Sequence, residues 1–415
     1  MRDDRRWRRL ALVPAIAVAA VVWGLVLATG GHRPAASGPT TYLEGATYGG
    51  PAVLATFDPA TGHVGHLLKA YVDAIAPGGK IGVSLDTNHN RVELVDLRTG
   101  RSGPPIRVGQ APGTVAFSPD GRTAYVVNLG IAAYEGGGGV PPPGEHVTDT
   151  VTPVNLTTGR AARPLTVCRN PAGAAYSAPT RLLVVGCRSR VVLVDTTDGR
   201  RVRTFRLGDA ALWGQIAVSP SGRTAVVGQT GFGDGSIASG SVVPIDLQTR
   251  TAGRPLSIGG NRGDDGAAQL QFRPGDNRDV YATTGRTLNS TGLGENVVLR
   301  VDLADRTVSA PLRLDGDPVA AVHFWPGGRA GYIALDTPEG RSSRWRASTS
   351  LDSSGRIVNL PLQSGVGERF PYDFAGQAPY LVIPQNKRQV TVVNLSRGQA
   401  RAVKVPMFPQ SPLTG

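Results

Sequence analysis

The segment that decides the fold is Val115-Ala-Phe-Ser-Pro-Asp-Gly-Arg-Thr-Ala-Tyr-Val-Val-Asn128. Its apolar alternation predicts two strands. Ser118-Pro-Asp-Gly121 between them predicts a tight turn, because proline presets φ and glycine accepts a positive φ. Related segments recur at residues 216–227, 270–276 and 322–329. The chain is therefore an array of repeats.

A second motif closes an apolar strand with Asp or Asn, in most copies followed four residues later by Gly. The side chain of such a residue bonds the backbone two residues on, and the last residue adopts a positive φ, which makes a hairpin turn. Arg250 and Arg306 replace the Gly in two copies, and the copy around Leu351 is shifted. The anchors are Asp58, Asp96, Asn155, Asp195, Asp246, Asp302, Leu351 and Asn394, separated by 38, 59, 40, 51, 56, 49 and 43 residues.

A constant unit of about 40 residues with variable inserts is typical of a propeller blade with four strands. In the unit that begins at Pro112, we expect strand A at 114–117, strand B at 123–128, strand C at 150–155 and strand D at 164–167. The fold class is therefore all-β, a β-propeller of four-stranded antiparallel blades. The repeat count predicts eight blades, with seven as the alternative. The first unit lacks a strand A, which residues 405–408 are expected to supply, pairing the two ends of the chain.

The N-terminus indicates a membrane anchor. Five arginines lie among the first nine residues, and residues 10–29 carry no charge, which is the span of a membrane helix. We expect a basic cytoplasmic flank at 1–9, a transmembrane signal-anchor at 10–29, a stalk at 30–40 and an extracytoplasmic propeller at 41–415. A cleaved signal peptide, and hence a secreted protein, is the alternative.

Cys168 and Cys187 are the two cysteines of the chain. In an exported protein an isolated pair predicts one disulfide, and two buried thiols are the alternative. Their positions at the ends of two expected strands of one repeat favour contact.

Composition narrows the range of partners. The net charge is +13, and 40 of the 44 basic residues are arginines spread singly through turns. No basic stripe with interleaved aromatic residues occurs, so we expect no nucleic-acid partner. The sequence leaves the oligomeric state open.

The segment Ser118-Pro-Asp-Gly-Arg-Thr-Ala-Tyr-Val-Val-Asn128, followed by Val154-Asn-Leu-Thr-Thr-Gly159, resembles the YVTN-type β-propeller repeat, a WD-like repeat. The resemblance covers roughly residues 42–408. It implies kinship with surface-layer and secreted propellers and with a superfamily that includes lactonases and haem- or quinone-dependent enzymes.

The position of a site follows from the order of the strands. In a four-stranded antiparallel blade the A–B and C–D turns share one face, and the B–C and D–A connections share the other. Length variation falls in the B–C connections, so we expect recognition on that face. The D–A connections open on the central channel, and the polar residues that we expect at its mouth as ligand-binding candidates are Arg169, Asp209, Trp213, Arg262, Asp264, Asp265, Asp317, Glu368 and Arg369.

Enzyme signatures are weak in this sequence. The six histidines show no zinc spacing, and no nucleophile elbow or haem-attachment motif occurs. The leading hypothesis is a bacterial cell-envelope scaffold that binds a protein, peptide or glycan, with no catalytic residue, metal or cofactor. The opposing hypothesis is a lactonase-like hydrolase of a sugar lactone, in which acidic residues of the channel hold a divalent cation.

Overall fold

The structure of the chain is a computed structural model. It describes residues 41–46, 52–130, 150–168, 171–187, 190–207, 216–230, 238–261, 269–284, 296–314, 317–318, 323–324, 331–336, 346–349, 358–360, 375–377, 380–385, 388–394 and 399–414. In this part of the chain the regular elements are all strands. No helix there is long and apolar enough to cross a membrane, and the expected anchor at 10–29 lies outside the described residues.

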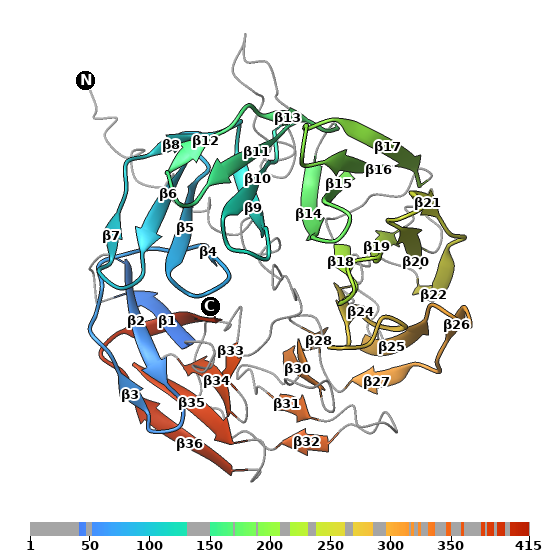
Figure 1. Ribbon diagram of the computed structural model, residues 1–415. Coiled ribbons are helices and arrows are strands. Elements are labelled where there is room, and N and C mark those ends of the chain that lie inside the picture. Colours follow the sequence, from blue (N-terminus) through green and yellow to red (C-terminus); the bar gives the residue numbers. More distant parts are fainter. Residues whose placement is uncertain are drawn as a thin grey trace, which may run out of the picture.

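The described strands form eight antiparallel sheets, which follow one another around a ring (Figure 1). We number the sheets in chain order. The first sheet contains β3 (His63–Val64), β2 (Ala52–Asp58), β1 (Thr41–Ala46) and β37 (Phe408–Thr414), and the second contains β4 (Ala74–Ile75), β5 (Ile81–Asp86), β6 (Arg91–Asp96), β7 (Arg101–Ser102) and β8 (Ile106–Arg107). The third sheet contains β9 (Pro112–Phe117), β10 (Thr123–Asn128), β11 (Thr150–Asn155), β12 (Arg160–Ala161) and β13 (Leu165–Thr166). The fourth contains β14 (Pro171–Ser177), β15 (Leu182–Cys187), β16 (Arg190–Asp195) and β17 (Arg201–Arg206).

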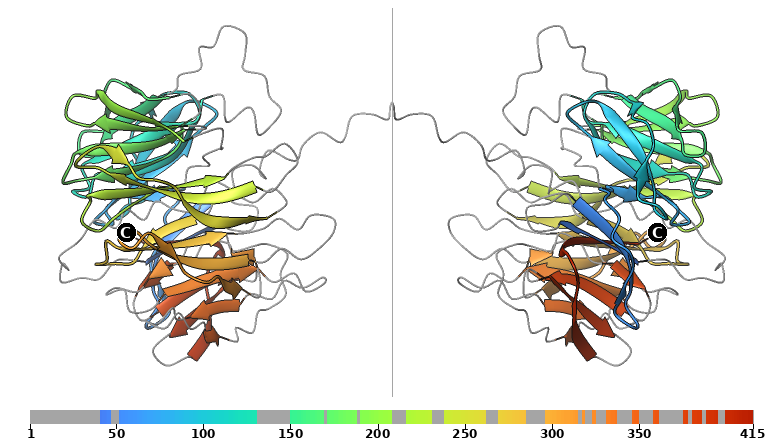
Figure 2. Two further views of the ribbon diagram at one scale, coloured as in Figure 1. Left: turned by 90° about the vertical axis from the view of Figure 1, so that its right-hand side faces the viewer. Right: turned by 90° about the vertical axis from the view of Figure 1, so that its left-hand side faces the viewer.

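The last four sheets repeat this order. The fifth sheet contains β18 (Ile216–Val218), β19 (Thr224–Thr230), β20 (Ala238–Asp246), β21 (Thr251–Ala252) and β22 (Leu256–Asn261), and the sixth contains β23 (Gln269–Phe272), β24 (Asp279–Thr284), β25 (Asn296–Asp302), β26 (Thr307–Val308) and β27 (Leu312–Leu314). The seventh sheet contains β28 (Asp317–Pro318), β29 (His323–Phe324), β30 (Gly331–Asp336), β31 (Arg346–Thr349) and β32 (Val358–Leu360). The eighth contains β33 (Ala375–Gln377), β34 (Tyr380–Gln385), β35 (Gln389–Asn394) and β36 (Gln399–Lys404). Figure 2 shows the same ring from two sides, with the sheets twisted against their neighbours.

The third sheet shows how the sequence produces one unit. β10 and β11 occupy the residues expected for strands B and C, and β9 begins two residues before the expected strand A. The outer strand is divided into β12 and β13, both of which pair with β11. The expectation of one continuous strand D is therefore wrong, because the outer strand consists of two short segments that pair separately with β11.

Both repeated turns form through the hydrogen bonds that their sequences predict. Ser118 Oγ donates to Asp120 Oδ1 at 2.6 Å, and Gly121 has a φ of 67°. In the second motif, Asn155 Oδ1 accepts hydrogen bonds from the backbone N–H groups of Thr157 and Thr158, at 2.9 and 2.8 Å. Arg250 and Arg306 stand where other copies have Gly and keep its left-handed backbone, with φ of 57° and 54°.

The apolar core lies between neighbouring sheets rather than within one layer. One cluster joins Val127 and Val151 of the third sheet to Leu183 and Val194 of the fourth. Other described clusters join the second and third, fourth and fifth, fifth and sixth, eighth and first, and first and second sheets. Each sheet is therefore stabilised mainly by the sheets on either side of it.

The ring is closed by the two ends of the chain. β37 is the innermost strand of the first sheet and pairs along β1, with Thr41 opposite Thr414 and Ala46 opposite Phe408. The expectation that the C-terminus supplies this strand is confirmed. The expected range of 405–408 is wrong, because Val405 and Met407 instead bury their side chains between the first and eighth sheets.

The outer edge of this seam is held by Arg401 of β36. Its guanidinium donates to the carbonyl oxygens of Pro59, Ala60 and Thr61 at 2.9, 2.7 and 3.4 Å. These carbonyls belong to the turn between β2 and β3. The first and eighth sheets are therefore joined by the apolar packing that includes Val405 and Met407 and, at the outer edge, by the hydrogen bonds of Arg401.

Cys168 and Cys187 form a disulfide, with their Cα atoms 6.2 Å apart. Cys187 ends β15 of the fourth sheet, whereas Cys168 follows β13 of the third sheet. The expectation that both lie in one repeat is therefore wrong, because the bond joins neighbouring sheets. Both side chains lie in the apolar cluster between these sheets.

Two glycine-to-alanine variants distinguish the cost of a positive φ in a turn from the cost of a steric clash between neighbouring sheets. Gly121 and Gly159 have similar φ values of 67° and 64°. A Cβ on Gly121 would lie 2.6 Å from the carbonyl oxygen of Pro77, in the preceding sheet, whereas a Cβ on Gly159 would have no atom within 4 Å. We expect Gly159→Ala to cost about 1–2 kcal/mol and Gly121→Ala to cost clearly more. Thermal unfolding midpoints measure both, and equal losses would show that the close approach to Pro77 has no energetic weight.

Candidate functional site

The channel-mouth residues expected from the sequence are mostly not described. Asp317 begins β28, where its backbone pairs with Asp336 of β30. The remaining candidates lie outside the described residues, and these are Arg169, Asp209, Trp213, Arg262, Asp264, Asp265, Glu368 and Arg369.

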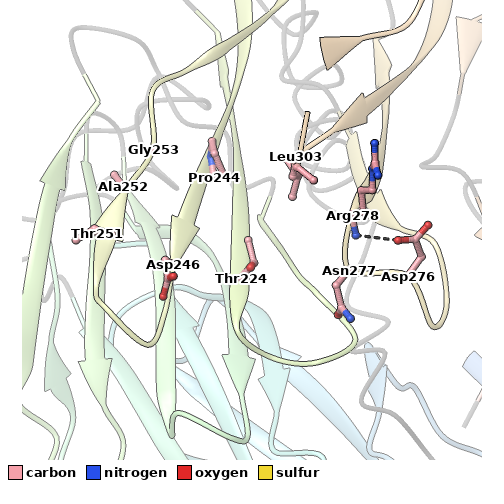
Figure 3. A pocket seen from close by; sticks show the side chains of 11 residues that line it. Thr224, Pro244, Asp246, Thr251, Ala252, Gly253, Asp276, Asn277, Arg278 and Leu303 are labelled. Carbon is pink, nitrogen blue, oxygen red and sulfur yellow. Dashed lines mark hydrogen bonds between the residues drawn. The ribbon is translucent and has the colours of Figure 1, made fainter. Parts of the chain in front are cut away.

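A groove of about 500 Å³ opens between the fifth and sixth sheets (Figure 3). It lies on the face where the A–B and C–D turns meet, which we call the turn face. One wall comes from β19, β20 and the turn into β21, and the other from the turns of the sixth sheet. Its lining comprises Thr224, Pro244, Asp246, Thr251, Ala252, Gly253, Asp276, Asn277, Arg278, Leu303 and Ala304.

The polar groups on the sixth-sheet side of this groove bond to their own protein. Arg278 Nε donates to Asp302 Oδ2 at 2.6 Å, and its terminal nitrogen pairs with Asp305. Asn277 Oδ1 accepts the N–H of Ser221 at 2.8 Å, which links the fifth and sixth sheets. The Arg278 ion pairs therefore brace the turns of the sixth sheet, and Asn277 ties that sheet to the fifth.

A different kind of cluster lies at the seam between the first and second sheets. We call Glu44, Tyr71 and Asp73 the seam cluster. Glu44 lies on β1, while Tyr71 and Asp73 lie on the connection between β3 and β4. This connection is of the D–A type, so the seam cluster lies on the opposite face from the groove, which we call the loop face.

The local backbone explains how an acidic side chain enters this seam. Tyr42 and Glu44 alternate with Leu43 on β1 and therefore share the face of the strand that meets the second sheet. Tyr42 packs there against Val72 and Val95. The pairing of β1 with β37 also shifts register between Glu44 and Gly45. Such a bulge changes the direction of a side chain.

Both carboxyl groups of the seam cluster are buried. Glu44 is 7% exposed and Asp73 is 8% exposed, whereas Tyr71 is 45% exposed. Asp73 Oδ2 accepts the backbone N–H of Leu85. Glu44 Oε1 is buried and has no hydrogen-bond partner. Neither carboxyl forms an ion pair with any Lys, Arg or His in the described part of the chain.

Burial dominates the electrostatics of the seam cluster. Desolvation, and then the charge of Asp73, raise the pKa of Glu44 to about 8 against the opposing effect of the Val72 N–H. Desolvation likewise raises the pKa of Asp73 to about 7, although the Leu85 N–H and the Tyr71 hydroxyl stabilise its charged form. The pKa of Tyr71 is raised by desolvation and by the neighbouring acids. The seam cluster thus holds two carboxyl groups that stay protonated to a higher pH than ordinary carboxyl groups do.

The candidates expected from the sequence include no member of the seam cluster. Asp73 immediately precedes β4, the strand A of its unit, and Asp317 begins β28, so the same topological reasoning applies to both. Tyr42, Glu44 and Ala46 occupy alternate positions along β1, so Glu44 lies on the same face of the strand as the two apolar residues. A charged residue at an apolar position of a strand is the sequence signal that could have identified it.

No group of three or more His, Cys, Asp or Glu side chains that could hold a metal occurs among the described residues. Apart from Asp317, the acidic channel residues on which the hydrolase hypothesis depends lie outside that part of the chain.

Comparisons with known proteins agree with this architecture. No protein-family model matches the chain, and no curated protein matches its sequence. Among solved structures, dihydro-heme d1 dehydrogenase NirN superposes with a TM-score of 0.62 at 12% identity, over 92% of this chain and 76% of that one. The Dos1 propeller gives 0.56 at 13% identity, over 80% and 83%. Kuenenia stuttgartiensis hydrazine synthase gives 0.52 at 19% identity, over 80% and 95%.

These likenesses, together with radially arranged sheets of four antiparallel strands, define the chain as a β-propeller protein. At such identities the likeness extends to the fold and no further.

The raised pKa values predict how stability depends on pH. The folded state binds protons on Glu44 and Asp73 more tightly than the unfolded chain does. The resulting stabilisation is complete below the unfolded values near 4 and is lost as pH rises through the folded values of about 7 and about 8. In a chelating buffer we expect the free energy of unfolding to fall, by roughly 6 kcal/mol, between about pH 5 and pH 9.

Glu44→Gln keeps the shape of the side chain and removes its charge, so this variant should lose the part of that decrease that Glu44 contributes and keep the part due to Asp73. Glu93→Gln, on the neighbouring β6, is the matched control and should keep the whole decrease. Chemical denaturation at several pH values measures all three proteins. Parallel pH profiles for the wild type and Glu44→Gln would contradict the assignment.

Proposed function

We propose that this chain is a membrane-anchored, extracytoplasmic β-propeller of eight blades that binds an envelope protein, peptide or glycan through its loop face. The observation that carries the proposal is the one-sided distribution of long connections. Connections of 21, 11, 9 and 7 residues follow β10, β24, β30 and β19, and all leave from strand ends on the loop face. Most turns on the opposite face have four or five residues.

Repeated short turns are explained by the geometry of the blades, whereas connections of individual length and sequence are explained by recognition. The longest, residues 129–149, joins a glycine tract to a proline tract. It adds length that β10 and β11 do not need for pairing, because their register is continuous from Thr123 opposite Asn155 to Asn128 opposite Thr150.

Two further features support the compartment in this proposal. The arginine-rich flank and the uncharged residues 10–29 are those of a signal-anchor with its C-terminal side exported. The Cys168–Cys187 disulfide fits an oxidising compartment, since such bonds are rare in the cytosol.

Site-specific photocrosslinking in intact cells tests this proposal with the full chain. A photoreactive residue is placed at Tyr134, within the 129–149 connection, or at Arg98, which is 85% exposed on the turn face. We expect discrete crosslinked products from position 134, none from position 98, and retention of both proteins in the membrane after alkaline extraction.

Equal products from both positions, or none from position 134, would contradict binding through the loop face. Release of the protein by alkaline extraction would contradict the retained anchor without affecting the assignment of the face. Digestion of the products with protease or with glycan hydrolase distinguishes a protein or peptide partner from a glycan.

A further inference from the structure

We propose that the seam cluster is a binding site for a hard divalent cation, Ca²⁺ in particular, which bridges Glu44 of the first sheet and Asp73 of the connection that begins the second. The site is separate from the groove of the turn face, and its residues are not among the channel-mouth candidates. It goes beyond the proposed binding role and does not depend on it.

One carboxylate oxygen of Glu44 is buried without a hydrogen-bond partner. A buried carboxylate oxygen without a donor is costly, and native structures seldom tolerate one. Glu44 Oε1 has no hydrogen-bond partner, and the side chain is 7% exposed. No cationic side chain in the described part of the chain pairs with Glu44 or Asp73. A bound cation would satisfy this oxygen and both charges at once.

The chemistry of the donors selects the kind of cation. The side-chain donors of the seam cluster are carboxylate and phenol oxygens, without nitrogen or sulfur, and oxygen ligands are those of Ca²⁺ and Mg²⁺. Ca²⁺ accepts irregular geometry and mixed carboxylate, carbonyl and water ligands, whereas Mg²⁺ demands near-octahedral geometry. An irregular pair of carboxylates from two separate elements therefore favours Ca²⁺.

Access to the site excludes larger cations. The two carboxyls are 7% and 8% exposed, which leaves little opening for an organic ammonium group. Tyr71, 45% exposed, is the most accessible member of the cluster and marks its solvent side. We expect a small ion to approach Glu44 and Asp73 from the side of Tyr71.

A cation at this position would link the first sheet to the second. β1 pairs with the C-terminal strand β37 on one side and meets the second sheet on the other. A cation held between Glu44 and Asp73 would therefore join the closing sheet to its neighbour on the loop face. Arg401 provides the comparable link on the opposite side of the closing sheet.

Thermal unfolding of the full chain at about pH 8, with millimolar CaCl₂ or with EDTA, tests the proposal. We expect Ca²⁺ to raise the midpoint of the wild type by about 2 °C or more. The increase should vanish in Glu44→Gln and persist in the matched control Glu93→Gln. Equal responses in all three proteins, or no response in the wild type, would overturn the proposal.

Terbium luminescence provides a readout that does not depend on stability. Tb³⁺ replaces Ca²⁺ at oxygen sites, and the adjacent Tyr71 should sensitise its emission. We expect emission that Ca²⁺ displaces in the wild type and a loss of at least about tenfold in Glu44→Gln. A midpoint that responds to pH but not to Ca²⁺, without terbium emission, would show that a proton occupies the site and would reject the cation.

Discussion

The pairing of β1 with β37 is the constraint on which the rest of the structure depends. Each sheet buries its apolar side chains against its neighbours, so an open ring would leave one such face on the first sheet and one on the last exposed to water. The strand pairing and the Val405 and Met407 contacts bury those two faces against each other. Arg401 adds three hydrogen bonds at the outer edge. Residues from opposite ends of the chain thereby become one sheet, and stability becomes a property of the whole ring.

Local features of this fold were predictable because their causes are local. A side chain that bonds a backbone N–H two residues away, as Asn155 does, depends on few other residues. The closing strand was predictable in kind, since the first unit lacks a strand, but not in position. Its sequence contains Pro409 and Pro412, which cannot donate to a ladder and argue against a strand. β37 is the innermost strand of its sheet and has one free edge, and a free edge accommodates proline.

The sequence predicted the face of the propeller on which the candidate site lies, but not the residues that form it. Reasoning from topology indicated the D–A connections on the loop face, and Tyr71 and Asp73 lie on one of them. The seam cluster was not predicted, because Glu44 comes from a strand of the first sheet and no spacing in the sequence relates it to Asp73. The resemblance to YVTN-type repeats agrees with the propeller fold, while the subtype itself stays a prediction. Function in this architecture belongs to residues that depart from the repeat. Glu44, an acid on the apolar phase of a strand, is such a departure.

The most direct test of the closing constraint is the thermal unfolding of a chain that ends at Met407 and so lacks β37. The account predicts a large drop in the unfolding midpoint, with partial recovery when a peptide of residues 408–415 is added. A chain that lacks only Gly415 should unfold like the full protein. An unchanged midpoint in the chain that ends at Met407 would contradict the account, because it would show that the ring does not depend on the pairing of its two ends.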